Sequence, residues 1–115
     1  MRYIDKLEPA HILDLTKEVP IAEEQMLSKT LVQRQDLGMT LFSLDKGQEI
    51  GRHSSLGDAM VNILSGTARI TIAEEDFDVT AGQSIILPAN IPHALFAKEA
   101  FQMLLIVVKP EADHD

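Results

Sequence analysis

Hydrophobic and polar residues alternate along most of this chain with the period of two that is typical of β-strands. The alternating runs are short, and turn residues such as glycine, proline, asparagine and aspartate separate them. Short strands at this regular spacing predict an all-β sandwich or barrel. One of the predicted turns is Asp36-Leu37-Gly38. The predicted strands cover residues 26–35, 39–45, 48–53, 58–64, 67–73, 77–80, 84–87, 91–97 and 101–108.

Residues 1–25 do not show this alternation of hydrophobic and polar residues. Their apolar positions fit neither the helical nor the strand period, and Pro9 and Pro20 interrupt them. We therefore expect a short N-terminal helix or strand that packs on the outside of one β-domain. That domain is predicted to span residues 26–110, and residues 111–115 form a short acidic tail.

The last predicted strand is apolar on both of its faces. Residues 103–108 read Met-Leu-Leu-Ile-Val-Val, whereas a strand with one face in water alternates apolar with polar residues. The second face therefore needs a cover, either from the N-terminal segment or from another copy of the chain. We predict a homodimer that forms through this sheet.

Composition narrows the class of protein. A chain of 115 residues with 45% hydrophobic and 24% charged residues is long enough for one domain with its own core. The formal charge of −8 and the lack of a lysine or arginine cluster argue against nucleic acid. There is no cysteine, so disulfides and thiolate metal sites are excluded. Because no signal peptide or membrane span is legible, we expect a cytoplasmic protein that binds no membrane.

Two histidines are the candidates for chemistry. In a regular strand without a bulge, His53 shares a face with Ser55. His93 shares a face with Ile91 and Leu95, and these apolar neighbours predict that it points inward. A buried imidazole needs hydrogen-bond partners or a metal ion. We therefore expect the two rings to face each other inside the barrel.

The spacing of these residues resembles the two sequence motifs of the cupins. The first motif reads Gly, five residues, His, one residue, His, three residues, Glu, six residues, Gly. The second reads Gly, five residues, Pro, one residue, Gly, two residues, His, three residues, Asn. The chain matches these motifs at Gly47, His53, Gly66, Gly82, Pro88 and His93. It departs from them at Ser55, Ala59, Asn90 and Ala97, which replace His, Glu, Gly and Asn. The resemblance implies a small single-domain cupin with a jelly-roll β-barrel.

The resemblance also implies a metal site, but the ligand set is incomplete. Of the four positions where cupins place ligands, only His53 and His93 keep a ligating side chain. Catalytic zinc usually has three protein ligands, and non-haem iron has two histidines and a carboxylate. We therefore expect a degenerate site, in which the two rings bond each other, Ser55, water or a ligand. Such a site would bind at most one divalent ion, and weakly.

Three functional hypotheses follow, and none of them names a substrate. The first is a small-molecule-binding protein with an aliphatic pocket in the barrel. The second is a metal-dependent enzyme, by resemblance to cupin dioxygenases, isomerases and decarboxylases, or an isomerase with one neutral histidine as general base. The third is a structural or interaction protein whose histidines have no role. The predicted ligand-binding residues are His53, Ser55, Val61, Ile63, Ile91, His93 and Leu95.

Overall fold

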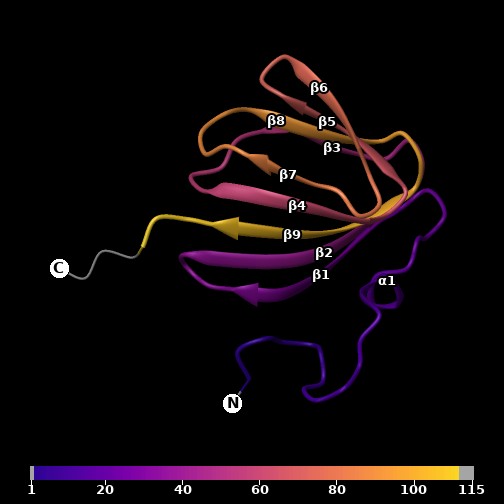
Figure 1. Ribbon diagram of the computed structural model, residues 1–115, viewed down its shortest axis with the longest axis vertical. Helices are drawn as coiled ribbons and strands as arrows, with labels where there is room; N and C mark the ends of the chain where they lie inside the picture. The colour runs from indigo at the N-terminus through magenta and orange to yellow at the C-terminus, as the bar shows by residue number, and fades with distance from the viewer. Residues whose placement is uncertain (1, 112–115) are drawn as a thin grey trace.

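The computed structural model describes residues 2–111, so the predicted acidic tail lies outside the described residues except for Glu111. Within this range the chain forms one short helix and nine strands (Figure 1). The elements are α1 (Leu15–Glu18), β1 (Met26–Gln33), β2 (Leu37–Leu44), β3 (Glu49–His53), β4 (Asp58–Ser65), β5 (Thr67–Ile72), β6 (Glu75–Thr80), β7 (Ser84–Leu87), β8 (His93–Ala97) and β9 (Phe101–Val108).

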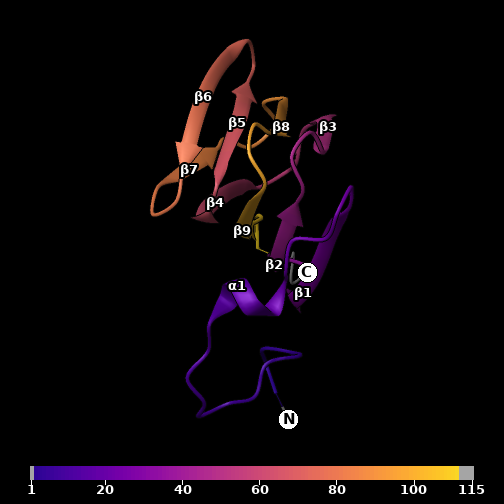
Figure 2. The ribbon, with the colours of Figure 1, turned by 90° about the vertical axis from the view of Figure 1, so that its right-hand side faces the viewer.

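The strands form two antiparallel sheets that pack face to face (Figures 1 and 2). The five-stranded sheet has the order β1-β2-β9-β4-β7, and the four-stranded sheet has the order β3-β8-β5-β6. Strands distant in sequence therefore become neighbours, because β9 lies between β2 and β4 and β8 lies between β3 and β5. Two sheets connected in this way form a jelly roll. The all-β class predicted from the alternation is confirmed.

Each predicted strand begins and ends within two residues of an observed strand. Two of the differing boundaries affect how the turns and the site are placed. The predicted turn at residues 36–38 is wrong, because Leu37 and Gly38 already pair with β9 in the strand β2. Residues 91 and 92 are also not part of a strand, and β8 begins at His93. Asn90 has a positive φ of 64°, and this turn conformation delays the start of the strand.

The main core fills the space between the two sheets. Inward side chains from both sheets meet there, and Val61, Ile70, Phe101 and Met103 are completely buried. Each buried side chain of this size contributes roughly 1.5–3 kcal/mol relative to leaving it in water. The inward face of the five-stranded sheet is thus covered by the second sheet.

The N-terminal segment packs on the outward face of the five-stranded sheet, on the side of β1 and β2. Val19 and Leu15 join a second apolar cluster there that includes Leu41 and Leu104. The buried side chain of Gln102 fixes the segment, because its Nε2 donates hydrogen bonds to the carbonyls of Thr16 (2.7 Å) and Val19 (2.9 Å). The expected N-terminal segment outside the sandwich is therefore present. None of the helices among residues 2–111 has the length and hydropathy needed to cross a membrane.

Two glycines allow close backbone contacts around β9. A Cβ added to Gly66 would lie 1.9 Å from the Ala100 carbonyl oxygen, and one added to Gly57 would lie 2.2 Å from the Val108 carbonyl oxygen. Gly66 also has a φ of +74°, which side chains rarely adopt. The glycine that closes the first motif is therefore required by the backbone, and not by chemistry.

We expect Gly66→Ala to reduce the free energy of unfolding strongly. Gly47→Ala is the matched control, since Gly47 also has a positive φ (+88°) but has open space where the Cβ would go. The control should cost about 1–2 kcal/mol for the left-handed conformation alone. Gly66→Ala should cost roughly 2 kcal/mol more, as expected for a substitution that displaces backbone. Equal losses in urea unfolding would contradict this assignment.

Candidate functional site

The structure brings His53 and His93 together. They occupy paired positions on the neighbouring strands β3 and β8. Their Nε2 atoms lie 3.2 Å apart, and the ring centroids lie 4.4 Å apart with an interplanar angle of 73°. Two residues forty positions apart in sequence therefore meet edge to face, as the two blocks of the motif predicted.

A bulge in β3 makes this contact possible. Ile50 pairs with Leu95 and His53 pairs with His93, so β3 uses one residue more than β8 over the same stretch. As a result Ile50 and His53 line the same cavity although they are three positions apart. The regular alternation assumed from the sequence is wrong within this strand.

Backbone carbonyls fix the protonation pattern of both rings. His53 Nδ1 lies 2.8 Å from the Gly51 carbonyl oxygen, and His93 Nδ1 lies 3.2 Å from the Ile91 carbonyl oxygen. A carbonyl oxygen only accepts hydrogen bonds, so each Nδ1 carries the proton. When both rings are neutral, each Nε2 is therefore an acceptor, and two acceptors face each other. This pair is satisfied only by a proton, another hydrogen-bond donor or a cation placed between the two atoms.

The two rings differ in their surroundings. His93 is 4% exposed, whereas His53 is exposed at the mouth of the barrel. The expectation that both rings would be enclosed is therefore wrong for His53, because His53 is the last residue of β3 and lies at the edge of the barrel. Burial lowers the pKa of His93 below its usual 6.5, and the nearby His53 ring lowers it further against the opposing effect of the Ile91 carbonyl. His93 is accordingly neutral at pH 7.

A cavity of about 160 Å³ opens beside the two rings. Its polar side chains are those of His53, Ser55 and His93, and its other walls are apolar. The cavity is lined by Met26, Phe42, Ile50, His53, Ser55, Ala59, Leu87, His93, Leu95, Met103, Leu105 and Val107. The rings thus form the polar end of an aliphatic pocket.

Four of the predicted site residues line this cavity, and three do not. His53, Ser55, His93 and Leu95 line it as predicted. Val61 and Ile63 point inward, but they lie in the closed core among other buried side chains. Ile91 lies in the turn before β8 and is 38% exposed, because the strand starts two residues later than predicted.

The sequence analysis missed the walls supplied by β2 and β9. Phe42 comes from β2, and Met103, Leu105 and Val107 come from β9. The period of two along β9 already places these three residues on one face of the strand and Leu104 on the other. The sequence therefore indicated that these side chains share a face. Their position beside the histidines, however, depends on the order of the strands in the sheet.

The remaining groups near the rings do not complete a metal site. The Ser55 hydroxyl donates to the Gly57 carbonyl (2.8 Å) and accepts from the Gly57 amide (3.1 Å). Ala59 has no donor atom, and Asp58 faces outward, where it accepts a hydrogen bond from the Ala89 amide (2.8 Å). Within residues 2–111 no group of three histidine, aspartate or glutamate side chains is placed to hold an ion. The donor set does not fit a tightly bound catalytic metal.

A small jelly roll with two histidines at the mouth of an aliphatic cavity defines the class of protein. The model of the cupin domain family matches residues 40–109, which is more than half of the chain. The chain therefore belongs to the cupin family, as the two motifs predicted.

Solved structures agree with this assignment. A conserved protein of unknown function from Streptococcus pyogenes is 70% identical, with a TM-score of 0.96 over 97% of this chain and 98% of that chain. A cupin superfamily protein from Desulfitobacterium hafniense is 29% identical, with a TM-score of 0.89 over 93% and 98% of the two chains. A cupin 2 conserved barrel domain protein from Leptotrichia buccalis is 42% identical, with a TM-score of 0.83 over 84% of this chain and 47% of that chain. No match is found among curated proteins.

The lowered pKa of His93 predicts a loss of stability on mild acidification. In the unfolded chain a histidine takes up its proton near pH 6.5, whereas folded His93 does so at a lower pH. Between these two values the unfolded chain binds more protons, so the free energy of unfolding should fall as the pH falls below 6.5. Urea unfolding at pH 7.5 and pH 5.5 measures this difference.

His93→Gln should flatten that pH dependence, because it removes the titrating group. His11→Gln is the control, since His11 lies exposed in the N-terminal segment. A wild-type chain that is equally stable at both pH values would contradict the assignment.

Proposed function

We propose that this protein is a small-molecule-binding cupin. The ligand places an apolar body in the barrel cavity and a hydrogen-bond donor, such as a hydroxyl group, against the Nε2 atoms of His53 and His93. The convergence of these two acceptors, 3.2 Å apart, is the observation that carries the proposal. A donor bound between the two nitrogen atoms supplies the hydrogen-bond partner that neither Nε2 offers the other when both rings are neutral.

The dimensions of the cavity restrict the ligand to a small molecule. Its volume of about 160 Å³ is below the roughly 300 Å³ at which sites for drug-sized ligands begin. An apolar cavity of about 150 Å³ accepts benzene. Among residues 2–111 no Asp, Glu, Lys or Arg side chain lines the cavity, so these residues offer the ligand no such ion-pair partner. These features favour a compact, uncharged aliphatic or aromatic molecule with one polar group.

The proposal also covers the cellular compartment in which the protein acts. We place the protein in the cytoplasm, which is consistent with a chain that carries no cysteine. Its proposed partners are the small-molecule ligand and a second copy of the chain.

Phenol and toluene form a matched pair of probes for the proposed site. Both have the size of a benzene derivative, but only phenol carries a hydroxyl donor. Phenol should bind about fivefold more tightly than toluene, because one net hydrogen bond is worth about 1 kcal/mol. Titrations followed by amide chemical shifts should place both probes beside β8 and β9.

The preference for phenol over toluene should depend on the buried imidazole of His93. His93→Leu should bring phenol and toluene to equal affinity, whereas Thr71→Ala, on the outward face of the same sheet, should keep the preference for phenol. Failure of both probes to bind the wild-type chain, or a preference that persists in His93→Leu, would refute the proposed contact.

A second candidate function is a metal-dependent enzyme of the dioxygenase, isomerase or decarboxylase type. The same two Nε2 atoms favour it, because zinc–imidazole bonds of about 2.0–2.1 Å in a tetrahedral site separate two nitrogens by about 3.3–3.4 Å. Their separation of 3.2 Å is close to that value. Both Nδ1–H groups are also held by backbone carbonyls, as is usual for histidine ligands. The missing carboxylate weighs against this function and makes it the weaker candidate.

Restoration of the carboxylate tests how much of the metal site remains. Ala59→Glu returns an acidic side chain to the cavity wall, and it should raise zinc affinity at least tenfold over the wild type. Ala59→Gln is the control with the same shape and no charge. Thermal shifts across a zinc titration report each affinity, since bound metal stabilises the folded state.

The wild-type chain should lose added zinc on dialysis. Retention of one equivalent, measured by elemental analysis on untagged protein, would favour the metal-dependent enzyme over the binding protein.

A further inference from the structure

Two exposed side chains mark the mouth of the cavity beside the imidazoles. Most of the side chains that line the cavity are buried or half-buried, whereas Met26 and His53 are the exposed members of its lining among residues 2–111. His53 ends β3 and Met26 begins β1, and each of these strands forms an edge of its sheet. The mouth therefore lies between two edge strands, with Met26 on one side and His53 on the other.

Met26 faces the interior but is not enclosed by it. It pairs with Leu44, whose side chain is completely buried in the main core, so both residues lie on the inward face of the five-stranded sheet. Nevertheless Met26 is 45% exposed, whereas Met103 in the same cavity is completely buried. The Met26 side chain is thus placed where the cavity meets water.

A methionine at this position can move without any movement of the strand. Its side chain is unbranched and flexible, and exposed side chains change rotamer within picoseconds to nanoseconds. The opposite side of the mouth is more firmly held, because the contact of 2.8 Å between His53 Nδ1 and the Gly51 carbonyl oxygen orients the imidazole. Met26 is therefore the movable side of the mouth.

The backbone that leads into Met26 is fastened to the turn between β2 and β3. The Asp45 carboxylate accepts hydrogen bonds from the backbone amides of Glu24 (2.7 Å) and Lys46 (2.8 Å). The Asp45 amide in turn donates to the Gln25 carbonyl (3.1 Å). The Glu24 and Lys46 amides lower the pKa of the Asp45 carboxyl, so this side chain is charged at neutral pH.

This fastening holds the chain in an unusual conformation. Glu24 has a φ of 58°, which lies in the left-handed region that residues with a side chain seldom adopt. Such a conformation persists only where surrounding contacts maintain it. The Asp45 carboxylate therefore fixes the direction in which the chain enters β1 at Met26.

We propose that Met26 is the gate of the cavity and that Asp45 is the residue that positions this gate. The proposal rests on the proposed function as a small-molecule-binding protein. The Met26 side chain narrows the mouth beside His53, and a ligand enters or leaves when this side chain rotates aside. Met26 thus sets the rate of ligand exchange, whereas the histidines hold the bound ligand.

The association rate constant of phenol tests the gate. Met26→Ala should raise this constant at least fivefold, because the shortened side chain no longer narrows the mouth. Met26→Phe should lower it at least twofold. A side chain that only contacts the bound ligand would change mainly the dissociation rate constant. Line shapes of amide resonances across a phenol titration give both rate constants.

Phe96→Ala is the matched control for Met26→Ala. Phe96 is also a large apolar side chain in a strand and is 39% exposed, but its neighbour Leu95 lines the cavity, so Phe96 lies on the outward face. Its association rate constant should stay within twofold of the wild type. A wild-type chain that binds phenol, with unchanged association in Met26→Ala, would overturn the gate and leave the proposed function standing. A wild-type chain that does not bind phenol would overturn both.

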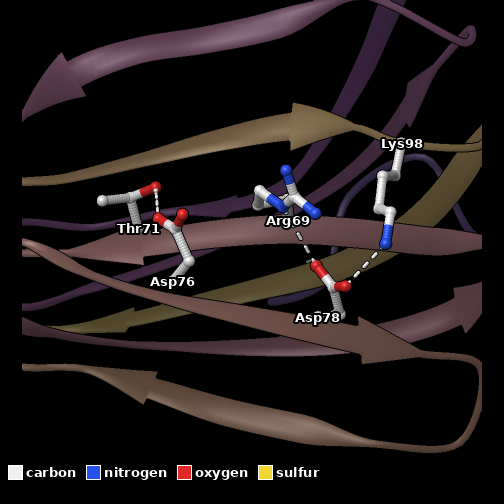
Figure 3. A network of polar contacts seen from close by, with 5 residues as sticks. All are labelled: Arg69, Thr71, Asp76, Asp78 and Lys98. Carbon is white, nitrogen blue, oxygen red and sulfur yellow. Dashed lines mark hydrogen bonds and ion pairs between the residues drawn. The ribbon is translucent and has the colours of Figure 1, made fainter.

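Asp45→Asn tests the positioning role. Asparagine offers one acceptor oxygen where aspartate offers two, so one of the two amide contacts is lost. The association rate constant of phenol should rise at least threefold, because the chain before Met26 gains freedom. Asp78→Asn is the matched control and should stay within twofold of the wild type. Asp78 also accepts from two donors, Arg69 Nε (3.2 Å) and Lys98 Nζ (2.7 Å), but it lies on the outward face of the four-stranded sheet (Figure 3).

The double variant Met26→Ala, Asp45→Asn separates positioning of the gate from a general loosening of the fold. If Asp45 acts through Met26, Asp45→Asn should change the association rate constant less than twofold once Met26 is shortened. An equal increase from Asp45→Asn in both backgrounds, or no increase in the wild-type background, would overturn the positioning role. Urea unfolding verifies that each variant is folded under the conditions of the titration.

Discussion

The extra residue in β3 is the constraint on which the site depends. Without it, the pairing of Ile50 with Leu95 would continue in register and bring Arg52 opposite His93. His53 would then lie on the outward face, and the barrel would contain one histidine and a guanidinium group. With the bulge, Arg52 points away and donates to the Ala73 carbonyl (2.8 Å), and the two imidazoles meet. Bulges of this kind commonly redirect a side chain at a functional site.

The contact between the rings does not depend on the ligand positions that the first motif has lost. The backbone carbonyls of Gly51 and Ile91 still orient both imidazoles, so their free nitrogen atoms still converge. Replacement of a carboxylate by Ala59 removes negative charge and adds apolar wall in the same step. The result is a site in which two nitrogen acceptors face an apolar cavity with no carboxylate at the position of Ala59. The family fold is retained although these ligand positions of the first motif differ.

Local patterns predicted the fold well, but they predicted only part of the site. Alternation located all nine strands, and the motif spacing brought His53 and His93 together, since both signals lie within short stretches of sequence. The cavity walls from β2 and β9 depend on strand order, which no short stretch encodes. The placement of Ile91 failed because the turn at Asn90 shifts the start of β8. Val61 and Ile63 were assigned the correct face, but depth along the barrel axis is not visible in the alternation.

One strand serves both surfaces of the five-stranded sheet. Leu105 and Val107 of β9 face the cavity, and Ile106 and Val108 face the opposite side. Neighbouring residues of one strand thus belong to two different layers of the molecule, and the backbone of β9 fixes the position of both.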